Sequence, residues 1–284
     1  MILCFLRTFA RLSARMRSEI VFMKRSMNLR LTLIYSIALL LSASCTSSRP
    51  PVIHSLTGGR LELTAALDAA PDTAVQRLVH TYKNRIDRVM SPVIGCAAVP
   101  LTADSMDSPL SRLVADVLRE AAVRHCGRKA DVGIINIGAI RSALPAGDIT
   151  LRHLYEVLPF DNRFCVVTLS GSQLRELFAA AVRERSVAVS GCTLTADASG
   201  HLLAATVGGS PLDDTCTYRV ATIDYLAEGN SRMVVLGTVT QKEFPSGVYL
   251  RDLFADHLSA LRAAGDSLTA PSQRRILLQS ETAP

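Results

Sequence analysis

Two side chains that can bind a polar ligand lie at the end of a short apolar run, or just after it, in the middle of the chain. Residues 131–136 read Asp-Val-Gly-Ile-Ile-Asn, which favours a buried strand, and a turn containing Gly138 then leads to Arg141. The amide of Asn136 can pair with a base edge or a hydroxyl, and the planar guanidinium of Arg141 suits a phosphate or carboxylate. Ligands usually bind at strand ends in α/β folds, and we expect Gly138 to make this backbone permissive.

A second loop supplies an aromatic ring. Residues 157–162 read Val-Leu-Pro-Phe-Asp-Asn. Pro159 restrains the residue before it and ends the preceding helix, which leaves Phe160 on a loop. A ring in that position can stack on a flat ligand.

Each of these side chains also has a purely structural interpretation. Asn136 could cap a turn, and Phe160 could belong to the core. Arg141 could pair with Asp148. The six histidines lie in no HxH, HExxH, DxH or GNH context, and GxSxG, Walker-A and GxGxxG motifs are missing from the sequence. The residues alone therefore leave binding and structural roles both open, and they give no obvious nucleophile, base or metal centre.

The elements that must position these loops alternate between helix and strand, which predicts an α/β domain. The pattern predicts helices over 74–90, 110–125, 151–157, 171–184 and 250–263, strands over 93–101, 131–136, 164–169, 217–223 and 275–278, and a hairpin of 187–194 with 201–207. The helix from 171 follows a capping box formed by Ser170 and Gln173.

The N-terminal residues predict export. Residues 31–43 are almost wholly apolar, follow a basic stretch and precede small residues and Cys45. Thirteen residues at about 1.5 Å each cannot cross a ~30 Å hydrocarbon core, so this is a bacterial signal sequence rather than a membrane span. Small residues before Cys45 resemble a lipobox, in which Cys45 is lipidated; the alternative is an ordinary cleavage site near a cysteine.

We therefore expect a leader over residues 1–45, whose true start is Met23 or Met27, and a tether over 46–56. The protein would be lipid-anchored in the cell envelope, on the periplasmic face or the cell surface. The formal net charge of +6 comes from the leader, because residues 46–284 hold 24 basic and 24 acidic residues. A neutral body argues against nucleic-acid binding. The five cysteines of the body form no CxxC pair, so we expect buried thiols rather than a zinc site.

Longer stretches around the candidate residues resemble the C-terminal domain of the 5′-nucleotidase family. They read Ile-Asn-Ile-Gly-Ala-Ile-Arg-Ser-Ala-Leu-Pro-Ala-Gly-Asp-Ile-Thr over 135–150 and Leu-Tyr-Glu-Val-Leu-Pro-Phe-Asp-Asn over 154–162, with further blocks at 189–191 and 221–229. The resemblance implies a single domain over 57–280, with a mixed sheet and flanking helices, that binds a nucleoside or nucleotide.

Carried over residue by residue, the resemblance puts Asn136, Gly138 and Arg141 in the ligand-contacting glycine block. Phe160 and Tyr225 fall on two aromatic positions that sandwich the base. Tyr225 could instead be a core residue at a strand end. The sequence departs from the family pattern at Ala139, which replaces a glycine, at Ser231, which replaces an acid that holds the ribose, and over 104–107, where a phosphate-binding arginine is missing.

In this family an N-terminal metallophosphoesterase domain holds two divalent metals and the catalytic Asp–His pair. About twenty residues separate the leader from the matching region, too few for such a domain. We therefore expect no catalytic residue, metal site or cofactor in this chain, and divalent metals only in a separate metallophosphoesterase chain. The competing hypotheses are a degenerate envelope protein that uses the fold for protein–protein contact, and an autonomous phosphohydrolase.

Overall fold

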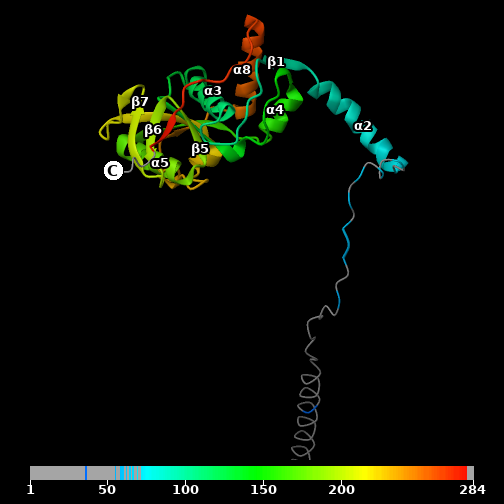
Figure 1. Cartoon of the computed structure of the whole chain (residues 1–284), viewed down its shortest axis with the longest axis horizontal. Coiled ribbons are helices and arrows are strands. Elements are labelled where there is room, and N and C mark those ends of the chain that lie inside the picture. Colours follow the sequence, from blue (N-terminus) through cyan, green and yellow to red (C-terminus); the bar gives the residue numbers. More distant parts are fainter. Residues whose placement is uncertain are drawn as a thin grey trace, which may run out of the picture. The chain divides into compact units, whose positions relative to one another are not determined.

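The structure is a computed structural model that describes residues 36, 55, 58–60, 62, 64, 66, 69 and 72–279. The chain divides into two units, Met1–Ala70 and Pro71–Pro284, and every element discussed below belongs to the second (Figure 1). The predicted lipidation site Cys45 and nearly all of the predicted leader and tether lie outside the described residues.

The second unit is a mixed α/β structure, as the sequence predicts. Its helices are α2 (Thr73–Met90), α3 (Pro109–Cys126), α4 (Leu151–Val157), α5 (Gly171–Glu184), α6 (Asp224–Ala227), α7 (Val234–Thr238) and α8 (Leu250–Ala264), with a 3₁₀ helix η2 (Ile137–Ala139). Its strands are β1 (Val93–Ala97), β2 (Val132–Asn136), β3 (Gly147–Thr150), β4 (Phe164–Ser170), β5 (Val187–Ser190), β6 (Cys192–Asp197), β7 (Leu202–Val207), β8 (Ser210–Pro211), β9 (Thr217–Ile223), β10 (Lys242–Glu243) and β11 (Ile276–Gln279).

A five-stranded sheet in the order β10-β4-β9-β2-β5 forms the centre of the unit. β2 and β9 run parallel, whereas the other neighbours in this sheet are antiparallel. Helix α3 packs on β2 and β5, and α5 packs on β4 and β9. All five residues of β2 are buried, which explains why its sequence is a continuous apolar run rather than an alternating one.

Close packing of helix on sheet depends on Gly133 in the middle of β2. A Cβ at this position would lie 2.2 Å from the carbonyl oxygen of Ala115 on α3. Any side chain would therefore push α3 away from the sheet. The core around this contact is aliphatic, with Phe164, Phe178 and Phe254 as its largest fully buried side chains.

A second sheet in the order β11-β6-β7-β8 corrects the predicted hairpin. Residues 187–194 are two strands rather than one, because Gly191 has a φ of +75° and breaks the run. β5 pairs with β2 in the central sheet, and only β6 forms the hairpin with β7. The turn over 197–200 lies where the sequence predicts it.

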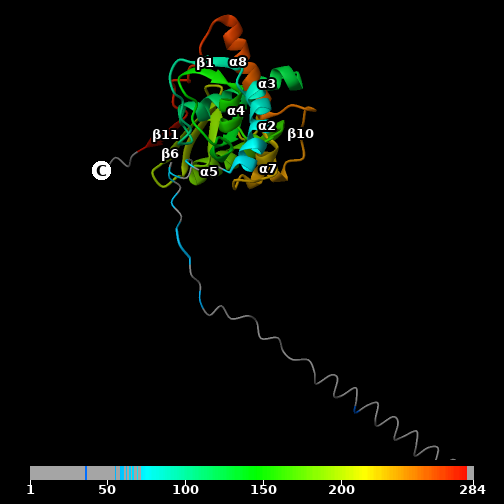
Figure 2. The same cartoon turned by 90° about the vertical axis from the view of Figure 1, so that its right-hand side faces the viewer.

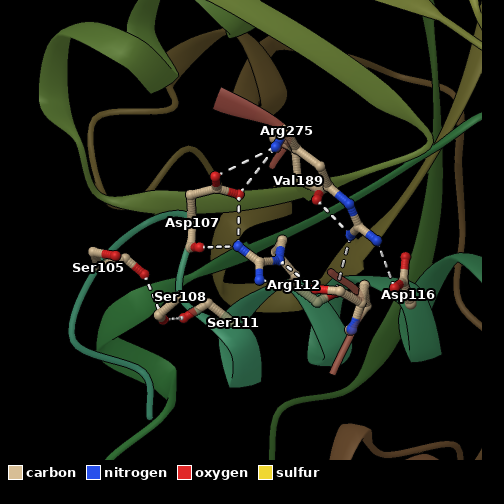
Figure 3. Close-up of polar contacts among 9 residues, drawn as sticks. Ser105, Asp107, Ser108, Ser111, Arg112, Asp116, Val189 and Arg275 are labelled. Carbon is tan, nitrogen blue, oxygen red and sulfur yellow. Dashed lines mark hydrogen bonds and ion pairs between the residues drawn. The ribbon is translucent and has the colours of Figure 1, made fainter. Parts of the chain in front are cut away.

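Strand β11 is fixed to α3 and β5 by a cluster of arginines and carboxylates (Figure 3). Arg275 Nη2 lies 2.7 Å from Asp116 Oδ2, and its Nη1 donates to the carbonyl of Val189 at 2.9 Å. Arg112, which is 7% exposed, donates twice to the carbonyl of Pro271 and pairs with Asp107. These contacts join the C-terminal strand and the loop before it to α3 and β5.

The expectation of buried cysteines holds for two of the five thiols in the body. Burial raises the pKa of Cys165 and of Cys192 to about 12. Cys96 and Cys126 are half-buried, and Cys216 is exposed on the loop before β9, so the prediction is wrong there. In the part of the chain that the structure describes, no helix is long and apolar enough to cross a membrane.

Candidate ligand-binding site

The candidate residues meet at one edge of the central sheet. β2 and β9 are parallel neighbours, so Asn136 at the end of β2 and Tyr225 just after β9 leave the sheet on the same side. β4 is antiparallel to β9 and pairs Phe164 with Ile223, which brings the loop before β4, with Phe160, to this edge. The sheet topology thus gathers residues that are up to ninety positions apart in the sequence.

A cavity of about 680 Å³ opens at this edge and contains all five predicted binding residues in its lining. The full lining is Asp104, Asn136, Ile137, Gly138, Ala139, Arg141, Phe160, Asn162, Arg185, Ser186, Tyr225 and Ser231. This volume suits a ligand of the size of a nucleoside or nucleotide.

Two polar atoms in the cavity wall are buried without a hydrogen-bond partner. They are Oδ1 of Asn136, a residue that is 7% exposed, and Oγ of Ser186. Asn136 precedes η2, but its side chain makes no capping hydrogen bond, so the turn-cap interpretation is wrong. A buried polar atom without a partner costs about 1–3 kcal/mol, which a bound ligand can offset by pairing with it.

Gly138 lies in the right-handed 3₁₀ turn η2, where the backbone does not require glycine. A Cβ there would come no closer than 3.5 Å, to Nδ2 of Asn136. The prediction that Gly138 is needed for its backbone freedom is therefore wrong, because other residues can also adopt this conformation. The Gly138 carbonyl accepts a hydrogen bond from Arg141 Nη1 at 3.3 Å.

The cavity carries an excess of positive charge. Arg141 and Arg185 are exposed guanidinium groups in its lining, and Asp104 is its one carboxylate. Arg141 does not pair with Asp148, and among the described residues neither arginine forms an ion pair. Each donates one hydrogen bond to a backbone carbonyl, Arg141 to Gly138 and Arg185 to Ala198, but neither charge is balanced by a carboxylate. Two unbalanced guanidinium groups favour an anionic portion of a ligand.

Phe160 and Tyr225 both project from the core. Their exposed fractions are 47% and 43%, so the core interpretations of both rings are wrong. Asp224 connects the two loops that carry them: its carboxylate accepts from the backbone N–H of Arg163 at 3.1 Å and from that of Tyr225 at 2.9 Å. Its Oδ2 also lies 3.2 Å from Nε of Arg163.

The Phe160 loop has a second attachment, to helix α8. Arg251 is 8% exposed, donates from Nη1 to the carbonyl of Leu158 at 2.9 Å, and pairs through Nη2 with Asp161. Its guanidinium lies over the ring of Tyr155 at 4.0 Å from the centroid. The carbonyl and carboxylate held by Arg251 flank Phe160, so α8 determines where this ring is placed.

The site also contains residues that the motifs do not predict. Arg185 and Ser186 precede β5 and reach the cavity because Val187 pairs with Asn136. Arg185 and Ser231 have φ values of 49° and 54°, a left-handed conformation that is uncommon outside glycine. Arg185 is the C-cap of α5, a position where a left-handed residue is common. Local sequence gives no signal for the strand pairing that brings it to the cavity.

Comparison with known proteins agrees with this geometry. A family model for the 5′-nucleotidase C-terminal domain matches residues 93–238, about half of the chain. The chain belongs to the 5′-nucleotidase C-terminal domain family. The resemblance seen in the sequence is thereby confirmed, and the family domain spans β1 to α7, including all five predicted residues.

Relatives and solved structures support the same assignment. The chain is 32% identical over 133 residues to Endonuclease YhcR of Bacillus subtilis and 31% identical over 169 residues to Protein UshA of Yersinia enterocolitica. These matches cover 45% and 57% of the chain but only 10% and 30% of the relatives. A 5′-nucleotidase precursor from Thermus thermophilus superimposes with a TM-score of 0.65 at 26% identity, covering 77% of this chain and 45% of that one.

In the described residues, no group of three or more His, Cys, Asp or Glu is placed to hold a metal ion. The departures from the family pattern, however, lie at the cavity: Ala139, Ser231 and Asp104 all line it.

Proposed function

We propose that this chain binds a nucleoside or nucleotide and presents it to a separate metallophosphoesterase chain in extracytoplasmic nucleotide hydrolysis. It would be exported and attached to the cell envelope through a lipid on Cys45. The observation that carries the binding proposal is the cavity itself, because two exposed rings and the unpaired Oδ1 of Asn136 all belong to its lining. Ring stacking suits a base, and the amide suits its polar edge.

The cavity also suggests how the ligand is divided among its residues. Phe160 and Tyr225 would hold the base, at about 1–3 kcal/mol for each stacked ring. Arg141 and Arg185 would meet the phosphate, and Arg185 would supply the charge that the family's upstream arginine provides elsewhere. Divalent metals would enter only with the partner chain.

Calorimetric titration of residues 46–284 with AMP, adenosine and UDP-glucose tests the binding proposal. We expect heat of binding for at least one of the three, and a loss of about tenfold or more in affinity for Phe160→Ala and for Tyr225→Ala. Tyr82→Ala is a matched control, because this tyrosine is 59% exposed but does not line the cavity. Titrations without heat at millimolar concentrations of all three ligands would exclude the proposal.

A second candidate function is protein–protein contact by a family member that has lost its ligand. Ser231 at the position of the family's ribose-binding acid favours it. Under this alternative Phe160→Ala leaves all three titrations unchanged. Phosphate release by the isolated chain that a chelator abolishes would instead point to an autonomous phosphohydrolase.

A further inference from the structure

Helix α2 presents a continuous apolar face that nothing in the described structure covers. The face, here the α2 stripe, consists of Val75, Leu78, Val79, Tyr82, Ile86 and Val89, each between 49% and 60% exposed. No residue of α2 is buried. At 3.6 residues per turn these positions share about a third of the helix circumference and extend along its whole length of about 27 Å.

The charges around the α2 stripe are almost all basic. Arg85 lies along one border and Lys83 along the other, and Arg77 and Arg88 occupy the opposite face. The only acid of the helix is Asp87, and it pairs with both Lys83 and Arg152 of α4. Two cations share this one carboxylate on the Lys83 border, so the net charge on both borders of the stripe is positive.

This charge pattern selects between possible occupants. If the stripes of two copies paired, the basic borders of one helix would meet those of the other and repel. An anionic lipid surface instead attracts both borders at once, while the apolar side chains enter the interface between headgroups and acyl chains. A helix of low overall hydrophobicity with a straight apolar face and a basic polar face is typical of such interfacial helices.

We propose that α2 binds the surface of a membrane that contains anionic lipids, with the α2 stripe facing the bilayer. This site goes beyond the proposed function and does not depend on it. α2 is the first of the described long helices after Cys45 in the sequence. A lipid at Cys45 and a basic amphipathic helix would act together, since stable attachment usually takes two signals.

Vesicle binding of unlipidated residues 46–284, which include the compact unit Pro71–Pro284, tests the proposal. The sequence contains no tryptophan, so Tyr82→Trp places a single fluorescent reporter in the stripe. We expect a blue shift and at least about tenfold stronger partitioning into phosphatidylcholine vesicles with phosphatidylglycerol than into phosphatidylcholine alone. Raising the salt concentration should weaken this binding, because it screens the basic borders.

Two double variants in the Tyr82→Trp background separate the stripe from the helix charge. Leu78→Glu with Ile86→Glu should reduce partitioning by about a hundredfold, because it places charge on the apolar face. Thr81→Glu with Asn84→Glu makes the same charge change on the polar face and should reduce it by less than about tenfold. Because no α2 residue is buried, both variants should keep the parent's urea midpoint.

Three results would overturn the proposal. The first is absence of a spectral shift with phosphatidylglycerol vesicles. The second is equal loss of binding in the two double variants. The third is a dimer in light scattering that Leu78→Glu dissociates, which would assign the stripe to a second copy of the chain. None of these results bears on nucleotide binding, which the titrations measure separately.

Discussion

At the scale of single residues, Asn136 shows how the site differs from the core around it. Thr222 is fully buried, and its hydroxyl donates to the carbonyl of Ile134 at 3.0 Å. Asn136 lies on β2, two residues after Ile134. It is nearly as buried as Thr222, but its Oδ1 has no hydrogen-bond partner. The hydroxyl of Thr222 is thus paired within the core, whereas the cavity wall contains an unpaired acceptor in Asn136.

This contrast predicts opposite effects of two substitutions. Asn136→Ala removes an unpaired acceptor, so the free energy of unfolding should change by less than about 1 kcal/mol, while nucleotide affinity falls about tenfold. Thr222→Val removes a satisfied hydroxyl, so stability should fall by about 1–2 kcal/mol with affinity unchanged. Urea unfolding and calorimetry measure the two quantities. A loss of more than about 2 kcal/mol for Asn136→Ala would show that the amide is paired in solution.

At the scale of elements, the Phe160 loop depends on α8 for its position. Arg251→Met keeps an apolar side chain of similar length but removes the hydrogen bonds to Leu158 and Asp161. We expect unfolding free energy to fall by about 1–3 kcal/mol and nucleotide affinity to fall with it. The informative measurement is a double-mutant cycle with Phe160→Ala: because Arg251 acts through Phe160, the two losses of affinity should not add. Additive losses would mean that Arg251 only stabilises the fold.

The cluster that holds β11 makes a different prediction. Arg275→Met removes the guanidinium that pairs with the Asp116 carboxylate. The Asp116 side chain is only 16% exposed, so water cannot fully replace that partner. An unpaired, largely buried carboxylate should lower the unfolding free energy by about 2–4 kcal/mol. Adding Asp116→Asn removes that charge and should restore part of the loss, which urea denaturation of the single and double variants measures. A double variant that is less stable than Arg275→Met would contradict this account.

The elements also show what the sequence can predict and why. The helix over α5 and its Ser170 capping box are confirmed, because cap and periodicity are local signals. The break at Gly191 is not predicted, because it depends on Asp131, whose carbonyl oxygen would lie 2.2 Å from a Cβ there. For the same reason the Asn136 and Phe160 motifs indicate the site, whereas Arg185 enters it only through the pairing of β5 with β2.

At the scale of the whole molecule, pairs of opposite charge join segments that are distant in the sequence. Arg219 of β9 and Glu243 of β10 form one, and Glu184 of α5 pairs with Arg232 at 2.9 Å. A hydrogen bond from Arg219 is the main cause that holds the pKa of Glu243 below its ordinary value. For Glu184 the neighbouring Arg183 is the main cause, with a further contribution from Arg232.

These shifts predict the direction in which acid affects stability. A carboxyl with a lowered pKa in the folded state takes up its proton more readily after unfolding, so acid favours the unfolded chain. Glu184 and Glu243 contribute fully above the ordinary glutamate value of 4.5, and their contribution is lost as the pH falls through their lower folded-state pKa values. The urea midpoint should therefore be flat near neutral pH and fall below about pH 4.5.

Glu243→Gln provides the decisive comparison, because it keeps the side-chain shape and removes the titrating group. The variant should be less stable than the parent near neutral pH, and the difference should shrink as the pH falls below 4.5, the ordinary glutamate value. The effect should be small, since the Glu243 side chain is 40% exposed and solvent screens the pair. A difference that stays constant from neutral pH to about pH 3 would show that Glu243 titrates in the folded chain as it does in the unfolded one, and that Arg219 does not stabilise its charge.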